Sequence, residues 1–372
     1  MRVRLLPAVA LLVVSTLSWP LAAARQAAHP AIVSTEFIYE RGPYPSVHAS
    51  TLVETTSGQL VAAWFGGTEE GDPDVSIWVA RLENGRWSPG VKVADGVQDA
   101  AKRHPTWNPV LFQPRGGPLM LFYKVGPSPR EWWGMVITSG DDGRTWSARR
   151  RLPEGILGPI KNKPVQLADG TIVAGSSTEA VDTDAWRVHV ERTRDLGQTW
   201  ERIGPLGDGG FNAIQPGILR HADGRLQLLC RSKEMHVPTS WSSDGGRTWT
   251  PLAASGLYAV NSGGDALTLQ DGRHVLVYNP RDQPGGAPAN YRPDMLTGIK
   301  DAPSGPRARW PLVVSVSRDG VAWKQALTLE DAPLRHGYAY PAVIQTRDGR
   351  IHVTYTFDRQ KIKHVVIDPA RL

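Results

Sequence analysis

The chain has 372 residues, a formal net charge of +6 and a single cysteine. One cysteine excludes an internal disulfide, so packing alone must hold the fold together. The positive charge is weak and dispersed along the chain, which disfavours nucleic-acid binding. Because no metal-ligand, phosphate-loop or dinucleotide motif occurs, we expect a protein without a metal ion or a cofactor.

The first residues have the order of a secretory signal peptide. Arg2 and Arg4 precede an apolar run of about 13 residues, which is too short to span a bilayer. Three alanines at residues 22–24 then offer a small-residue cleavage site. We therefore expect residues 1–24 to be removed and residues 25–372 to form one secreted or periplasmic domain with no membrane span.

A Gly-containing turn followed by an alternating apolar strand recurs along the rest of the chain, as in "ADGTIVAGS" and "RDGRIHVTY". This pattern indicates a β-hairpin. Most of its glycines lie about 50–60 residues apart, a spacing typical of repeat architectures. They are Gly58, Gly117, Gly170, Gly224, Gly272 and Gly349. The sequence therefore predicts six repeated sheets.

A second repeat follows most of these hairpins and fits the pattern S/T-x-D-x-G-x-T-W, known as an Asp-box. Complete copies contain Asp141, Asp195 and Asp244, and degenerate copies end at Trp87 and Trp323. The Asp can accept backbone N–H bonds, the Gly supplies a positive φ, and the Trp packs beneath the turn. We therefore expect the three aspartates to lie in hairpin turns far from any pocket.

Six such units predict an all-β fold, a six-bladed β-propeller. The chain after Gly349 is too short to complete the sixth blade. The N-terminal segment "AIVSTEFIYE" is well placed to supply the missing strand and to close the ring, which would protect the edge strands. Residues 280–309 are rich in Pro and Gly and predict a loop inserted in the fifth blade.

Asp-boxes on a six-bladed ring with an N-terminal closing strand resemble the exo-α-sialidase superfamily over nearly the whole mature chain. The first blade, "SVHASTLVETTSGQLVAAWFGGTEEGDPD", is similar to the family's Phe/Tyr-Arg-Ile-Pro segment and the strand and D-x-G-D-x-D loop that follow it. The resemblance places His48 at the family's first substrate-binding arginine. It places Glu69, five residues before Asp74, at the acid/base aspartate.

The fourth, fifth and sixth blades carry the other matches to the family. Gln215 stands where the family has a glutamate, and Arg231 stands at its second arginine. The segment "RARWPLVVSVSRDG" resembles the region of the third arginine, which Arg309 or Arg307 would supply. The segment "GYAYPAVIQTRDG" is similar to the family's A-Y-S-x-L motif and implies that Tyr340 is the nucleophile.

These residue types suit a sugar that carries a carboxylate on its anomeric carbon. Clustered arginines bind a carboxylate through charge-assisted hydrogen bonds, and a neutral tyrosine hydroxyl is not repelled by it. The tyrosine needs a base to take its proton, and a carboxylic acid must protonate the leaving oxygen. Because the amide of Gln215 cannot act as a base, His48 is the candidate for that role.

Polar residues also stand at equivalent points of successive blades, which converge on one end of the central channel. For several of these residues a purely structural role is the alternative: His48 as a core histidine, Glu69 as part of a solvated turn, and Trp107 as a buried ring instead of a stacking platform. The predicted catalytic residues are Tyr340, Glu69 and His48. The predicted substrate-binding residues are Arg231, Arg309, Gln215, Arg103, Trp107, Asn108 and Asn162.

The sequence thus predicts a secreted, monomeric glycoside hydrolase of sialidase type that releases a terminal acidic sugar from a glycan. Two alternatives stay open. One is a uronate-directed hydrolase or polysaccharide lyase, in which His48 or His104 acts with Tyr340 to abstract a proton next to a neutralised carboxylate. The other is a catalytically silent glycan-binding propeller, which is compatible with Gln215 in place of glutamate.

Overall fold

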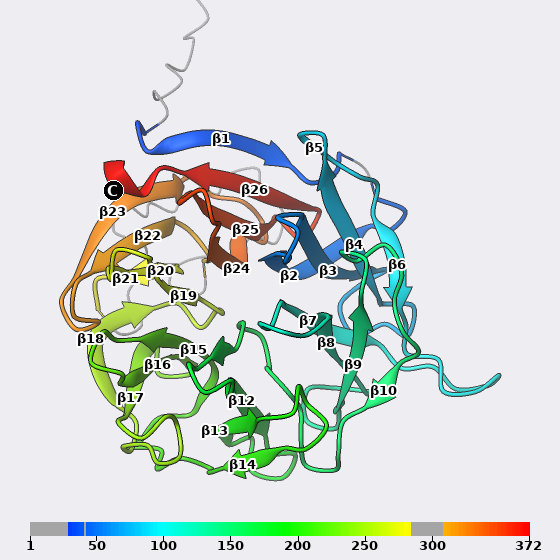
Figure 1. Ribbon diagram of the computed structural model, residues 1–372, viewed down its shortest axis with the longest axis horizontal. Helices are drawn as coiled ribbons and strands as arrows, with labels where there is room; N and C mark the ends of the chain where they lie inside the picture. Colours follow the sequence, from blue (N-terminus) through cyan, green and yellow to red (C-terminus); the bar gives the residue numbers. More distant parts are fainter. Residues whose placement is uncertain (1–28, 41, 284–307) are drawn as a thin grey trace, which may run out of the picture.

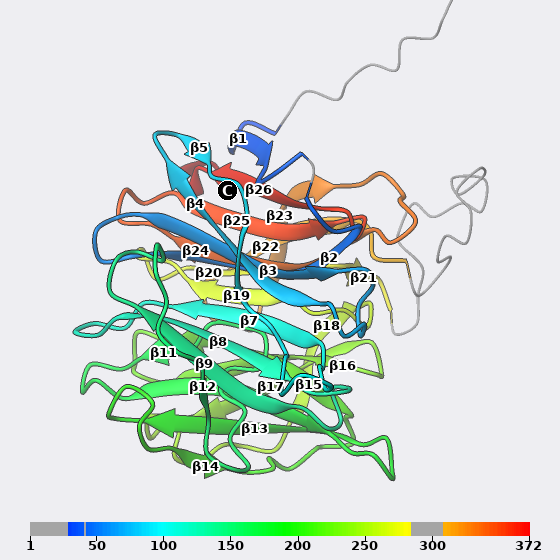
Figure 2. The same ribbon diagram turned by 90° about the vertical axis from the view of Figure 1, so that its right-hand side faces the viewer.

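A computed structural model describes residues 29–40, 42–283 and 308–372 as six antiparallel sheets around a central axis (Figure 1). Seen from the side, the strands run between the two faces of the ring (Figure 2). The predicted six-bladed all-β propeller is confirmed. The predicted signal peptide and most of the predicted insertion in blade 5, Arg307 included, lie outside the described residues.

The first three blades follow one another along the chain, each starting at the central axis. Blade 1 contains β2 (Ser46–Glu54), β3 (Leu60–Gly67), β4 (Ser76–Glu83), β5 (Arg86–Trp87) and β6 (Val91–Ala94). Blade 2 contains β7 (Thr106–Phe112), β8 (Leu119–Val125), β9 (Trp133–Ser139) and β10 (Arg150–Arg151). Blade 3 contains β11 (Val165–Gln166), β12 (Ile172–Glu179), β13 (Trp186–Thr193) and β14 (Glu201–Ile203).

The other three blades complete the ring. Blade 4 contains β15 (Ala213–Arg220), β16 (Leu226–Ser232), β17 (His236–Ser242), β18 (Ala253–Ala259) and the short β21 (Pro280–Arg281). Blade 5 contains β19 (Asp265–Thr268), β20 (His274–Tyr278), β22 (Leu312–Ser317) and β23 (Trp323–Glu330). Blade 6 contains β24 (Tyr338–Gln345), β25 (Ile351–Phe357), β26 (Lys361–Ile367) and the N-terminal β1 (Ile32–Phe37).

The ring closes as the sequence predicts. Strand β1 pairs antiparallel with β26 at the outer edge of blade 6, with Phe37 opposite Lys363. The first and last described strands are therefore hydrogen-bonded, and the outer edge of β26 is covered. A single turn of 3₁₀ helix, η3 (Pro369–Arg371), follows β26. None of the described residues forms a helix long and apolar enough to cross a membrane.

Apolar side chains pack between neighbouring blades and form the core. Between blades 1 and 2, for example, Phe65 on β3 packs in one cluster with Leu121 and Tyr123 on β8. All three side chains are almost fully buried. The same cluster includes Tyr340 of blade 6, so the core extends to the centre of the ring.

The glycine turns join the first and second strands of each blade, and the Asp-box turns join the third and fourth. Because the strands in each blade alternate in direction, both kinds of turn lie on one face of the ring, and the hairpins between the second and third strands lie on the other. In the Asp-box of blade 3, the Asp195 carboxylate accepts hydrogen bonds from the Thr199 N–H at 2.8 Å and the Thr199 hydroxyl at 2.6 Å. Asp141 and Asp244 make the matching bonds. In blade 2 the predicted turn contains two adjacent glycines, and the one with a positive φ is Gly116, at 73°.

Candidate active site

Four of the six innermost strands contain a β-bulge at the same point. The strand register shifts there, and the bulge residue has a positive φ, which is unusual for a residue other than glycine. A bulge redirects the side chains around it, and bulges are frequent next to active sites. The four bulge residues are Ala49, Asn108, Gln215 and Tyr340. The bulges at Gln215 and Tyr340 place two of the predicted residues at the centre of the ring.

The hydroxyl of Tyr340 is the meeting point of the predicted residues. Arg231 Nη1 donates a hydrogen bond to it at 2.7 Å, and Gln215 Nε2 donates another at 3.1 Å. Both partners are donors, so they can stabilise negative charge on the phenolic oxygen but cannot take its proton. The side chains come from three strands of two blades that lie far apart in sequence, as the sequence predicts.

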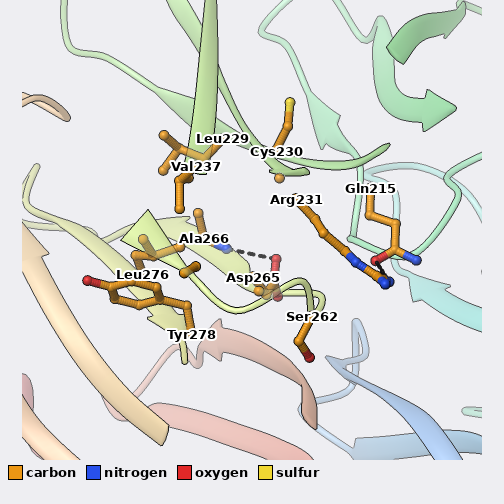
Figure 3. Close-up of a pocket in the computed structure, with 13 residues that line it drawn as sticks. Gln215, Leu229, Cys230, Arg231, Val237, Ser262, Asp265, Ala266, Leu276 and Tyr278 are labelled. Carbon is orange, nitrogen blue, oxygen red and sulfur yellow. Dashed lines mark hydrogen bonds between the residues drawn. The ribbon is translucent and has the colours of Figure 1, made fainter. Parts of the chain in front are cut away.

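Arg231 is held by several contacts. Its Nε donates to Asn261 Oδ1 at 2.5 Å, and its Nη1 also lies 3.3 Å from Gln215 Oε1. The guanidinium carbon lies 5.1 Å from the centre of the Trp186 ring, a cation–π contact. Arg231 and Gln215 line a small cavity between blades 4 and 5 (Figure 3), whose volume of about 20 Å³ is large enough for one water molecule.

Arg309 joins this cationic centre from blade 5. Its side chain is partly buried, and burial lowers its pKa to about 10, while the Tyr340 hydroxyl favours the charged form and Arg231 opposes it. The side chain therefore stays positive at neutral pH. Among the described residues, neither Arg231 nor Arg309 forms a salt bridge with a carboxylate, so two guanidiniums stand at the centre without an ion-pair partner there.

His48 lies against Tyr340 instead of bonding to its hydroxyl. The two ring centres are 4.1 Å apart, His48 Nδ1 lies 3.0 Å from Thr356 Oγ1, and His48 Nε2 has no hydrogen-bond partner within the described parts of the chain. The side chain is fully buried. Burial, followed by the positive charge of Arg359, holds the His48 pKa well below its usual value. His48 is therefore neutral at pH 7, and its role as the base stays a prediction.

The loop at residues 68–75 of blade 1 brings Glu69 and Glu70 to an open cavity of about 440 Å³ between blades 1 and 6. Glu70 Oε2 pairs with Arg359 Nη1 at 2.5 Å, whereas the exposed Glu69 lines the cavity without a salt bridge among the described residues. Asp74 accepts the N–H of Thr68 at 2.9 Å and so shapes the loop. The structure thus leaves Glu69 as the freer of the two carboxylates.

Three other predicted residues have structural roles. Arg103 Nη2 donates to the Asp74 carbonyl at 2.9 Å and so braces the loop that carries Glu69. Trp107 is buried, and its Nε1 donates to the Gly126 carbonyl, which matches the structural alternative for this ring. Asn108 is a buried bulge residue with φ of 38°. Their proposed substrate contacts stay predictions.

Blade 3 supplies a buried lysine and an amide beneath the centre. Lys161 Nζ donates to the carbonyls of Gly264 and Pro341, at 3.0 and 2.6 Å, and lies 5.6 Å from the centre of the Tyr340 ring. Burial lowers the pKa of Lys161 to about 7. Asn162 Nδ2 donates to the Gln215 carbonyl at 3.1 Å and so supports the bulge of blade 4.

Two residues at this centre were not singled out from the sequence. Arg359 lies in the hairpin after β25, and Glu179 lies at the end of β12, where burial raises its pKa and Arg231 partly opposes the shift. Both stand at the end of the second strand of a blade, on the face that carries the 68–75 loop. A charged residue at the end of the second strand of a blade is therefore the signal by which the sequence could have indicated both. No group of three or more His, Cys, Asp or Glu side chains that could hold a metal ion occurs within the described ranges.

The six-bladed ring, the Asp-box turns and the arginine–tyrosine centre together define a sialidase-like β-propeller. The chain belongs to the BNR repeat-like domain family, whose model matches residues 58–353. No curated protein is significantly similar to it in sequence.

Solved structures share this fold at low sequence identity. A protein of unknown function from Dyadobacter fermentans is 17% identical, with a TM-score of 0.70, over 91% of this chain and 99% of that one. NanB sialidase from Streptococcus pneumoniae is 12% identical, with a TM-score of 0.67, over 91% and 71% of the two chains. The intramolecular trans-sialidase from Ruminococcus gnavus is 13% identical, with a TM-score of 0.64, over 92% and 99%. The TM-scores show a common fold.

Proposed function

We propose that this protein is a glycoside hydrolase of sialidase type, which releases a terminal acidic sugar, sialic acid or a related acid, from glycans. The observation that carries the proposal is the contact of Arg231 with the Tyr340 hydroxyl at 2.7 Å, together with the nearby guanidinium of Arg309, for which the described residues show no carboxylate partner. Two guanidiniums in a partly buried centre favour a bound carboxylate. A carboxylate bound by Arg231 would therefore lie close to the Tyr340 oxygen.

In this proposal, Arg231 and Arg309 bind the carboxylate and orient the sugar, and Tyr340 attacks or stabilises the anomeric carbon. The donors Arg231 and Gln215 can stabilise negative charge that develops on the phenolic oxygen during the attack. Glu69, exposed at the cavity between blades 1 and 6, protonates the leaving oxygen. Export is part of the proposal and is supported by the signal-peptide pattern of residues 1–24.

A second candidate function, a glycan-binding propeller without catalysis, is favoured by one specific observation. The Tyr340 hydroxyl accepts two hydrogen bonds, and neither Gln215 nor Arg231 can accept its proton. The neighbouring His48 is neutral but weakly basic, because burial lowers its pKa. A centre built this way binds a carboxylate as well as a catalytic centre would, whether or not turnover follows.

The products separate these functions. Purified protein is incubated with sialosides and with uronate-containing glycans, and the mixture is analysed for released sugar and for near-ultraviolet absorbance. Hydrolysis liberates a reducing sugar and supports the proposal, whereas elimination creates an absorbing double bond and supports the lyase. Binding of the glycans without either product supports the second candidate. Tyr340→Phe, checked for an unchanged circular dichroism spectrum, should release neither product if Tyr340 acts as proposed.

A further inference from the structure

A separate cavity lies between blades 2 and 3, on the face of the ring that carries the 68–75 loop. Its volume of about 280 Å³ is close to the lower end of the range typical of small-molecule sites, about 300–1,000 Å³. Blade 2 lines it with the hairpin between β8 and β9 and with the chain after β10, and blade 3 lines it with β12 and β14. The proposed function assigns no role to this cavity.

Two adjacent tryptophans line the cavity. Trp132 ends the hairpin between β8 and β9, Trp133 begins β9, and both rings are partly exposed. The buried ring of Trp107 packs edge-on against Trp132, with the ring centres 6.0 Å apart, and so helps to fix its orientation. An indole ring offers an apolar surface against which the C–H face of a pyranose can pack.

The polar side chains around these rings carry both signs of charge. Arg151 and Arg202 bring N–H donors to the cavity, and Glu154 and Glu179 bring carboxyl oxygens. The Arg151 guanidinium lies 4.8 Å from the centre of the Trp133 ring and forms no salt bridge within the described parts of the chain. A hydroxyl group both donates and accepts hydrogen bonds, so a neutral sugar can use both kinds of side chain. A second carboxylate would instead meet two glutamates.

The cavity adjoins the centre of the site through blade 3. Glu179, which lines the cavity, is paired across β12 and β13 with Trp186. The Trp186 ring centre lies 5.1 Å from the guanidinium carbon of Arg231, which donates to the Tyr340 hydroxyl. One residue pair and one cation–π contact therefore separate the cavity from the arginine that is proposed to hold an acidic sugar.

We propose that the cavity between blades 2 and 3 is a second subsite, which binds a neutral pyranose of the same glycan whose acidic sugar lies at the centre. This inference rests on the proposed function and extends it to an oligosaccharide substrate. Trp132 packs against the apolar face of the pyranose, and Arg151, Arg202 and Glu154 bond to its hydroxyl groups. The subsite selects the glycan and takes no part in bond cleavage.

The test compares three ligands by titration calorimetry on the full chain: N-acetylneuraminate, lactose, and a thio-linked sialyllactose, which resists hydrolysis. The wild-type protein should bind the trisaccharide more tightly than the acid alone. Trp132→Ala should lower this preference for the trisaccharide by about five- to thirtyfold, the effect of truncating an aromatic anchor. Arg151→Ala should lower it in the same direction, and thermal unfolding checks that both variants are folded.

Arg150 provides the matched control for Arg151. The two residues are neighbours on β10, and successive side chains of a strand point to opposite faces of a sheet. Arg150 Nη2 donates to the Gly197 carbonyl at 3.1 Å, and the side chain does not line the cavity. Arg150→Ala should therefore keep the preference of the wild-type protein.

Equal affinity of the wild-type protein for the acid and the trisaccharide would overturn the inference, as would an unchanged preference in Trp132→Ala and Arg151→Ala. If Trp132→Ala does not fold, Arg151→Ala decides alone, because its side chain is exposed and its loss leaves no buried gap. Lactose separates the two proposals. If lactose binds, and binds more weakly to Arg151→Ala, while the acid does not bind, the proposed function fails and the neutral-sugar subsite stands. If no ligand binds, both fail.

Discussion

Replacement of Arg231 tests the centre of the site most directly. Its guanidinium contacts Tyr340, Gln215 and Asn261 and stacks on Trp186. Arg231→Ala removes the donor nearest to the Tyr340 oxygen and one of the two guanidiniums without a carboxylate partner among the described residues. The expected result is a loss of affinity for an acidic sugar, because the remaining guanidinium of Arg309 cannot form the same paired contact alone.

The magnitude follows from the environment of the side chain. Truncating one partner of a buried, hydrogen-bonded charge pair costs roughly 2–5 kcal/mol. Arg231 is only partly buried, so we expect the lower half of that range, about 2–3 kcal/mol, which corresponds to about a 30- to 150-fold weaker Kd. Arg231→Lys should recover part of it, because an ammonium keeps the charge but loses the planar fork.

The assay compares kcat/KM for a sialoside and Kd for N-acetylneuraminate in the wild-type protein and both variants, with thermal unfolding as a check on folding. The methyl ester of the sugar is the control ligand, since a contact with the carboxylate should not affect a neutral ester. Equal affinity for the acid in all three folded proteins would refute the reasoning and would make Arg231 a structural residue.

Five further outcomes can be measured. Tyr340→Phe should abolish turnover without lowering the melting temperature; substantial activity in this variant would show that Tyr340 only lines the pocket. Gln215→Glu should raise turnover, since a carboxylate beside the Tyr340 hydroxyl can accept its proton. Asp195→Ala should destabilise the exposed turn by about 1 kcal/mol in chemical denaturation and leave turnover per folded molecule unchanged. Burial lowers the pKa of His352 to about 4, so between pH 6.5 and 4 the unfolded protein takes up a proton that the folded protein does not. The stability contributed by neutral His352 is therefore present above pH 6.5 and is lost as the pH falls toward 4. A His352→Asn variant should show a smaller loss of melting temperature over that interval. The pKa of His48 is lowered as well, so an acid limb of the pH–rate profile near pH 6.5 that disappears in His48→Asn would contradict the burial described for it.

The fold could be predicted because its signals are local. The turn glycine and the Asp-box aspartate act within a few residues of themselves, as the bonds from Asp195 to Thr199 show. Closure by the N-terminal strand also followed from the sequence, since the sixth blade lacks a strand after Gly349. The turn of blade 2 shows the same local control: two adjacent glycines could supply its positive φ, and Gly116 does.

The candidate site could be predicted in part. Tyr340, Gln215 and Arg231 meet as expected, because equivalent points of the inner strands converge at the axis. Arg359 was missed because its neighbour on β2 lies more than 300 residues earlier, and only ring closure brings the two together. The sequence also did not indicate that Arg103 binds the carbonyl of Asp74, since a guanidinium near a pocket can bind a backbone carbonyl as readily as a ligand.

The two faces of the ring explain how a shared fold can carry altered chemistry. The hydrogen bonds of each Asp-box begin and end within one turn, on the face away from Tyr340, so blade geometry does not depend on the residues at the axis. A change such as glutamine at position 215 alters proton transfer beside Tyr340 while leaving those turns intact. Arg359, in a hairpin of blade 6, illustrates the same freedom, because ring closure brings its positive charge beside β2 from the other end of the chain. The chemistry of such a propeller has to be inferred from the side chains at the axis, because the repeats that reveal the fold lie on the opposite face.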